Sequence, residues 1–211
     1  MPVNCWISDF IFSCLSLAAG FFKDDLQGAW SKFSKRIWPS LGMIALLFGL
    51  VLLGQIFSNL LMGILYQIVN LTKEKGLNQA TVERLLTNRQ LFLPAVFSIV
   101  VTGPFVEELV FRKSLMDTGR KFMSILLIII LQALLFAAIH MHALQISEFI
   151  SVIPQLITAL IWGIFYSKTD QIFYPVTVHI LINTIGILLV CLIWDLLKSA
   201  RADFSFEQIP I

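Results

Sequence analysis

The chain has 211 residues, of which 58% are hydrophobic and only 13% are charged. Soluble domains average about 25% charged residues, so this composition excludes an ordinary soluble protein. The formal net charge of +2, without a basic tract, gives no indication of nucleic-acid binding. Cys5, Cys14 and Cys191 lie in or beside apolar runs without metal-ligand spacing, and their odd number gives no disulfide framework.

Apolar runs separated by short polar segments predict an all-α, polytopic membrane protein with about six transmembrane or membrane-embedded helices. The first run, at 5–22, carries Asp9 and has no basic start, which indicates a short span or an interfacial helix. A polar connection at 23–39 leads to a long apolar segment at 41–69. The segment 71–90 is the main loop outside the membrane, and apolar residues at helical spacing within it predict a short amphipathic helix.

The third span, at 91–116, is interrupted by Pro94 and by Gly103-Pro104, and we expect a new helix to start with Pro104 in its first turn. Three more spans are expected at 122–142, 149–166 and 173–197. Without repeats or linkers, residues 1–211 form a single membrane domain, with an N-terminal helix and connection at 1–40.

Basic residues give the expected orientation. With alternating spans, the connections 23–40, 112–121 and 168–172 share one side and hold most of the lysines and arginines of the short loops. The positive-inside rule therefore places the 112–121 turn in the cytoplasm.

Three charged side chains lie inside the otherwise apolar third span: Glu107, Glu108 and Arg112. A charge near the bilayer centre costs about 2.5–3.5 kcal/mol on insertion scales, so these residues need a reason to be there. On a helix, Glu108 and Arg112 are four residues apart and can pair. Glu107 projects about 100° away from Glu108, which leaves it as the strongest functional candidate.

Later spans contribute further polar groups. His140 follows Phe136 by one helical turn, and His179 and Asn183 share one helix face. A carboxylate with histidines can activate water as a general base, with donors left to stabilise an oxyanion. Each group also has a structural explanation: a histidine bonded to a carbonyl, an asparagine joining two helices, or a buried ion pair. No motif for a nucleophilic serine or cysteine is present.

The expected depths of these groups differ. Counted from the basic turn at about 1.5 Å per residue, Glu107 lies about 15 Å deep, His179 about 10–15 Å and His140 about 25 Å. His140 is therefore expected several ångströms too deep to lie level with the other two.

The three motifs Glu-Glu-x-x-x-Arg at 107–112, Phe-x-x-x-His at 136–140 and His-x-x-x-Asn at 179–183 occur in this order on successive spans. Together they resemble the CPBP family of intramembrane proteases, which includes CAAX prenyl endopeptidases and bacterial relatives linked to bacteriocin self-immunity and peptide processing. The resemblance covers roughly 91–190. The family usually has glycine after the motif arginine, and Lys113 at this position bears on helix packing and on substrate access.

The resemblance implies a role for each motif residue. Glu107 would be the water-activating base, assisted by His140. His179 and Asn183 would stabilise the oxyanion, while Glu108 and Arg112 would support the site.

The leading hypothesis is thus a glutamate-type intramembrane endopeptidase that needs no cofactor and cleaves a peptide or protein substrate at or in the lipid bilayer. We expect it in a bacterial plasma membrane, with the site opening to the cytoplasm. In a less favoured version, Glu107, His140, His179 and Asn183 bind zinc. The non-enzymatic alternative is a membrane immunity or peptide-binding protein of the same family. A transporter is disfavoured because the chain lacks paired broken helices.

Overall fold

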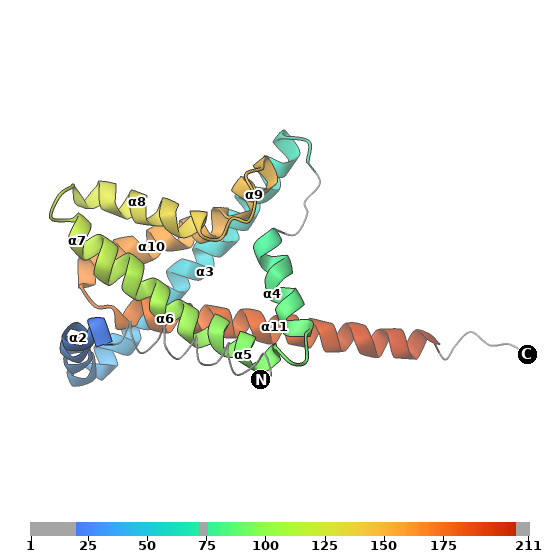
Figure 1. Ribbon diagram of the computed structural model, residues 1–211, viewed down its shortest axis with the longest axis horizontal. Coiled ribbons are helices and arrows are strands. Elements are labelled where there is room, and N and C mark those ends of the chain that lie inside the picture. The colour runs from blue at the N-terminus through green and yellow to red at the C-terminus, as the bar shows by residue number, and fades with distance from the viewer. Residues whose placement is uncertain (1–19, 72–75, 206–211) are drawn as a thin grey trace, which may run out of the picture.

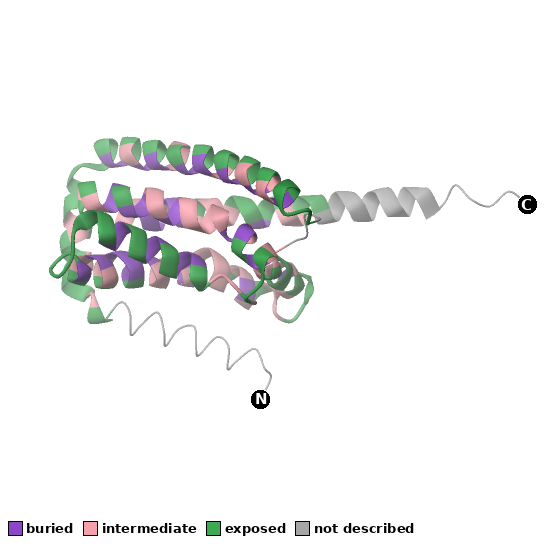
Figure 2. Ribbon diagram, turned by 90° about the horizontal axis from the view of Figure 1, so that it is seen from above, coloured by how far each residue is buried: buried purple, intermediate pink, exposed green. Residues whose placement is uncertain are grey.

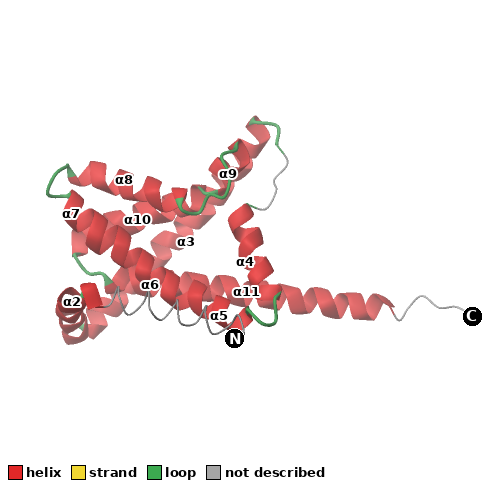
Figure 3. Ribbon diagram, in the orientation of Figure 1, coloured by secondary structure: helices red, strands yellow, loops and turns green. Residues whose placement is uncertain are grey.

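The computed structural model describes residues 20–71 and 76–205, with 194–205 as backbone alone, and the regular elements in these ranges are all helices (Figure 3). Three of them are long and apolar enough to cross a membrane: Ile37–Ile68, Phe92–Gly119 and Phe173–Ile193. Their outward faces are largely exposed, as expected for surfaces that contact lipid (Figure 2). The all-α membrane fold is therefore confirmed. The run at 5–22 lies mostly outside the described residues.

The N-terminal segment contains a helix where a plain connection was expected. Helix α2 (Lys23–Lys35) precedes the long helix α3 (Ile37–Ile68). It forms because apolar residues recur every three or four positions, and this face packs on the start of α11. The Trp30 and Phe33 rings lie 5.5 and 5.9 Å from the Phe173 ring. The short helix expected in the 71–90 loop is present as α4 (Leu77–Thr87).

The helix that carries the charged motif runs from Phe92 to Gly119 without the break expected at Gly103-Pro104. It comprises α5 (Phe92–Phe97), the π-helix η1 (Ser98–Thr102), α6 (Gly103–Glu108), the π-helix η2 (Leu109–Met116) and α7 (Asp117–Gly119). Gly103 keeps helical torsion angles, φ −56° and ψ −60°, and its N–H donates to Ser98 O. The wide π turn admits the proline without breaking the helix. A Cβ atom on residue 103 would lie 2.9 Å from Ser98 O, so the close turn favours glycine.

Four helices complete the described part of the chain: α8 (Ile125–Ala138), α9 (Ile146–Ser151), α10 (Ile153–Thr169) and α11 (Phe173–Ser205). Helix α8 has 14 residues, so it is about 21 Å long and shorter than the roughly 30 Å hydrocarbon core. It ends before His140, which lies in the following turn. The expected span at 122–142 is therefore too long at both ends.

The helices form two groups that meet at the site (Figure 1). Helix α10 packs on both α8 and α3, and small residues bring these helices close together. A Cβ atom on Gly163 would lie 2.5 Å from Gln132 of α8, and one on Gly54 of α3 would lie 2.5 Å from Ile161. The Phe92–Gly119 helix crosses this group and also packs on α11, which brings the motif residues of three helices together.

Candidate active site

The centre of the site is a buried pair of opposite charges on one helix. Arg112 Nε lies 3.0 Å from Glu108 Oε2, and both side chains have no exposed surface. The pairing expected from their four-residue spacing is therefore present. The N–H groups of Arg112 are not aligned for hydrogen bonds to any described residue, so the contact is an ion pair rather than a hydrogen-bonded fork.

Aromatic rings surround the Arg112 guanidinium in place of hydrogen-bond acceptors. Its central carbon lies 5.3 Å from the ring of Phe136 on α8 and 5.4 Å from the ring of Trp162 on α10. Cations are attracted to the faces of aromatic rings, most strongly where water is excluded. Three helices are thus joined around one buried positive charge.

His179 on α11 lies between the two carboxylates of the motif. Its Nδ1 lies 3.0 Å from Glu108 Oε1, and its Nε2 lies 3.9 Å from Glu107 Oε2. Because a carboxylate accepts hydrogen bonds, Nδ1 carries the proton in this contact and Nε2 is directed toward Glu107. The Trp162 ring lies 4.4 Å from the imidazole and fixes its plane.

Glu107 is the less constrained of the two carboxylates. Its side chain is 27% exposed, whereas that of Glu108 is completely buried. One carboxylate oxygen, Oε2, is nevertheless buried and has no hydrogen-bond partner among the described residues. Glu107 is therefore a partly accessible acceptor beside a histidine, while Glu108 is held by Arg112 and His179.

Asn183 supplies a hydrogen bond that Pro104 cannot donate. In the π register of η1, where the N–H of residue i+5 donates to the carbonyl of residue i, the partner of Ile99 O would be Pro104. Proline has no N–H, so this carbonyl lacks a donor within its own helix. Asn183 Nδ2 on α11 donates to Ile99 O at 2.8 Å. The amide has a second N–H beyond this bond.

His140 lies apart from the other motif residues. Its Nδ1 lies 2.8 Å from Phe136 O, and because a carbonyl only accepts, Nδ1 is protonated and Nε2 is the free nitrogen in the neutral ring. The His140 and Phe136 rings lie 4.9 Å apart with their planes tilted by 34°, and the Phe136 ring lies 6.1 Å from the His179 ring. The structure therefore brings Glu107, Glu108, Arg112 and His179 together. It bonds Asn183 to Ile99 of the motif helix and connects His140 to His179 through the Phe136 ring.

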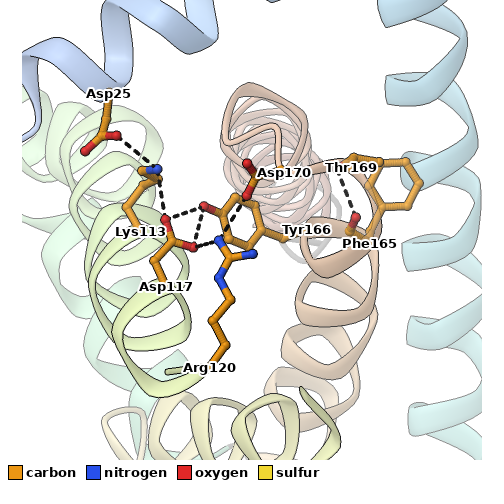
Figure 4. Close-up of polar contacts among 8 residues, drawn as sticks. All are labelled: Asp25, Lys113, Asp117, Arg120, Phe165, Tyr166, Thr169 and Asp170. Atoms are coloured by element: carbon orange, nitrogen blue, oxygen red, sulfur yellow. Dashed lines mark hydrogen bonds and ion pairs between the residues drawn. The ribbon is translucent and has the colours of Figure 1, made fainter. Parts of the chain in front are cut away.

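Lys113 is directed toward Asp25 of α2 and Asp117 of α7 (Figure 4). Its Nζ lies 2.9 Å from Asp117 and 3.4 Å from Asp25 of α2. The lysine that replaces the family's usual glycine therefore ties α2 to the motif helix.

Asp117 is shared by further partners at the same end. It pairs with Arg120 and accepts a hydrogen bond from Tyr166 at 3.0 Å, while Arg120 also contacts Asp170 at 3.0 Å (Figure 4). Together with the Lys113–Asp25 pair, these contacts join the end of the motif helix to the first turn of α2 and to the turn after α10.

The residues present do not fit the zinc site considered from the sequence. Of the four expected ligands, Glu107 and His179 are close together, Asn183 is bonded to Ile99, and His140 is bonded to Phe136. Among the described residues, no three His, Cys, Asp or Glu side chains are grouped so that they could hold a metal ion. We therefore derive no step through zinc.

Two residues of the site were not singled out by the sequence. Phe136 was quoted only as part of a motif, and Trp162 was one aromatic residue among many in an apolar segment. Both contact Arg112 and His179. Their role depends on helix packing, for which a single sequence carries no signal.

The fold defines a helical membrane protein, because three of its helices could cross a bilayer. Its buried carboxylates, histidine and arginine are polar groups suited to acid–base chemistry. Residues 89–185 match the family described as "Rce1-like: Type II CAAX prenyl endopeptidase Rce1-like". This stretch, a little under half of the chain, is similar to that family, which supports the resemblance to CPBP proteases. The matched region contains every motif residue: Glu107, Glu108, Arg112, His140, His179 and Asn183. A search of curated proteins and a search of solved structures found no match to the chain.

Proposed function

We propose that the chain is an intramembrane endopeptidase in which Glu107 activates a water molecule to hydrolyse a peptide bond. The observation that carries the proposal is the buried Oε2 of Glu107, which has no hydrogen-bond partner among the described residues. It lies 3.9 Å from Nε2 of His179, whose ring Glu108 orients. The family match supports a CAAX-protease-like peptidase as the general class.

The separation of Glu107 and His179 suits one water molecule. A distance of 3.9 Å is too long for a direct hydrogen bond, but a water can lie about 2.8 Å from both atoms. In this position the water donates to Glu107 and accepts from Nε2 of protonated His179. Glu108 orients the ring by accepting a hydrogen bond from Nδ1.

The reaction follows from these contacts without an acyl-enzyme. The water oxygen attacks the peptide carbonyl carbon while Glu107 takes the water proton. The oxyanion that forms accepts from Nε2–H of His179 and from the second N–H of Asn183. When the C–N bond breaks, Glu107 returns the proton to the leaving nitrogen, and the carboxylate is restored.

The remaining residues have supporting roles in this proposal. Arg112 balances the charge of Glu108 in the apolar interior. His140 assists Glu107 less directly, as a proton acceptor through Nε2 at the edge of the site, because Phe136 separates it from His179. We place the chain in a bacterial plasma membrane with the Lys113 end in the cytoplasm.

The test compares wild type with Glu107→Gln and with Asp24→Asn, a control at an exposed carboxylate of α2. Each full chain is purified in nanodiscs and given a quenched fluorescent peptide library, with and without a prenyl group, and metal content is measured on the same samples. We expect Glu107→Gln to lower cleavage by about 10²–10⁴-fold and Asp24→Asn to leave it unchanged. Equal cleavage by wild type and Glu107→Gln would refute the role of Glu107. Absence of cleavage by a folded wild-type chain would favour the non-catalytic, peptide-binding alternative.

A further inference from the structure

A polar cavity of about 440 Å³ lies between α3, α4 and α10 and next to the end of α9. Amide side chains from three helices line it, together with a tyrosine: Gln55, Asn59, Tyr66, Asn78, Gln79 and Gln155. Two of these, Gln55 and Asn59, belong to the apolar span Ile37–Ile68. Polar groups inside a membrane span generally line the path or the site of a polar ligand.

The chemistry of the lining selects an uncharged ligand that both donates and accepts hydrogen bonds. Gln155 Oε1 is buried and has no hydrogen-bond partner among the described residues. A ligand N–H would satisfy it, and a buried acceptor left without a donor is unfavourable. None of the described residues that line the cavity is charged, so from them a charged ligand would lose its hydration without gaining an ion pair. An extended peptide backbone, with alternating N–H and C=O groups, fits these requirements.

The α4 wall of the cavity is fixed to the turn that carries His140. The buried carboxylate of Glu148 on α9 accepts from the N–H of Leu77 at 2.9 Å and from the N–H of His142 at 3.2 Å. This contact anchors the first turn of α4, so the wall is set relative to the end of α8.

The distance to the site follows from α10. Gln155 precedes Trp162 by about two helical turns, or roughly 10 Å, and Trp162 contacts His179. An extended peptide advances about 3.3 Å per residue, so roughly three residues cover this distance.

We infer that the cavity binds an extended, uncharged segment of the substrate, centred about three residues from the scissile bond. The position relative to that bond depends on the proposed function, whereas peptide binding in the cavity does not.

The test measures binding and cleavage separately on the full chain in nanodiscs. Fluorescently labelled short peptides of uncharged residues, and the same peptides with one aspartate, are titrated onto the Glu107→Gln protein. Gln155→Leu and Asn59→Leu are added in turn, with Gln67→Leu, an exposed glutamine of α3 outside the cavity, as the control. We expect each cavity variant to weaken binding of the uncharged peptides about tenfold and the control to leave it unchanged. The aspartate peptides should bind weakly to all forms. Asn59 is exposed, so its variant tests the cavity even if Gln155→Leu impairs folding.

The outcomes separate the two proposals. Equal binding to Gln67→Leu, Gln155→Leu and Asn59→Leu would overturn the cavity as a peptide site, even if Glu107 proves essential for cleavage. If both cavity variants lose binding in a chain that cleaves no peptide, the cavity is supported as a peptide site and the proposed endopeptidase activity is refuted. A benzophenone placed on the peptide three residues from the scissile bond should crosslink to α3, α4 or α10. Crosslinks confined to other helices would contradict the inferred three-residue distance between the cavity and the scissile bond.

Discussion

At the residue scale, Arg112 is the side chain whose removal should cost the fold most. It is completely buried beside Glu108, so Arg112→Met leaves a buried carboxylate without its compensating charge. Breaking a buried ion pair costs about 3–5 kcal/mol, which corresponds to a fall in melting temperature of about 10 °C for a chain of this size. The measurement is thermal unfolding in detergent.

The double variant Glu108→Gln/Arg112→Met gives the internal control, since it removes both charges and should recover much of the loss. Arg84→Met removes an exposed arginine on α4 and should leave the melting temperature within about one degree. If Arg112→Met and Arg84→Met have the same melting temperature, the buried ion pair contributes nothing to stability.

Trp162 should matter for the rate rather than for substrate binding, because it fixes the His179 ring and contacts Arg112. We expect Trp162→Leu to lower kcat about tenfold with little change in KM. Trp162→Phe should retain most activity, because an aromatic face remains and the indole N–H has no hydrogen-bond partner in the described part of the chain. Trp38→Leu, at a position 81% exposed, is the control. Equal losses in the Phe and Leu variants would contradict this positioning role.

At the element scale, the π-helix at Ser98–Thr102 links Pro104 to Asn183. Asn183→Leu leaves Ile99 O without a donor and should cost about 1–2 kcal/mol of stability. In a Pro104→Ala background the alanine N–H can bond to this carbonyl, so the same substitution should cost less. A double-mutant cycle of unfolding free energies measures the difference. The same cost in both backgrounds would show that Asn183 does not compensate for the proline.

The ion pairs of Lys113 should hold α2 against the motif helix. Their partners are partly exposed, with Asp25 56% and Asp117 22% accessible, so the expected contribution is about 1 kcal/mol or less. We predict that Lys113→Met increases hydrogen exchange of the α2 amides up to about fivefold. Lys121→Met, at an exposed lysine, should not change this exchange. Unchanged α2 exchange in Lys113→Met would mean that the apolar face of α2 holds it alone.

The sequence identified which segments are helical and apolar, because composition and periodicity are local properties. The prediction of a helix break at Gly103-Pro104 was wrong. Whether a proline breaks a helix depends on the hydrogen-bond register and on outside donors such as Asn183, and neither is encoded nearby. The sequence also missed α2, whose apolar face is explained by its contact with Phe173.

At the scale of the whole molecule, the site forms where helices far apart in sequence meet. The sequence supplied the motif residues, and their helical spacing correctly placed Glu108 beside Arg112. It could not show that His179, rather than His140, lies next to Glu107, because this depends on how α8 and α11 pack around Phe136. The aromatic rings around Arg112 could not be foreseen for the same reason.

Our central claim is that Glu107 and His179 act together on one water molecule, and the most direct test is the kcat of the double variant Glu107→Gln/His179→Gln. Groups that act as a unit are strongly non-additive, so the double variant should be no slower than the slower single variant. Each single substitution should lower kcat by about 10²–10⁴-fold. If the two losses instead multiply in the double variant, the residues act independently, and the shared-water mechanism is wrong.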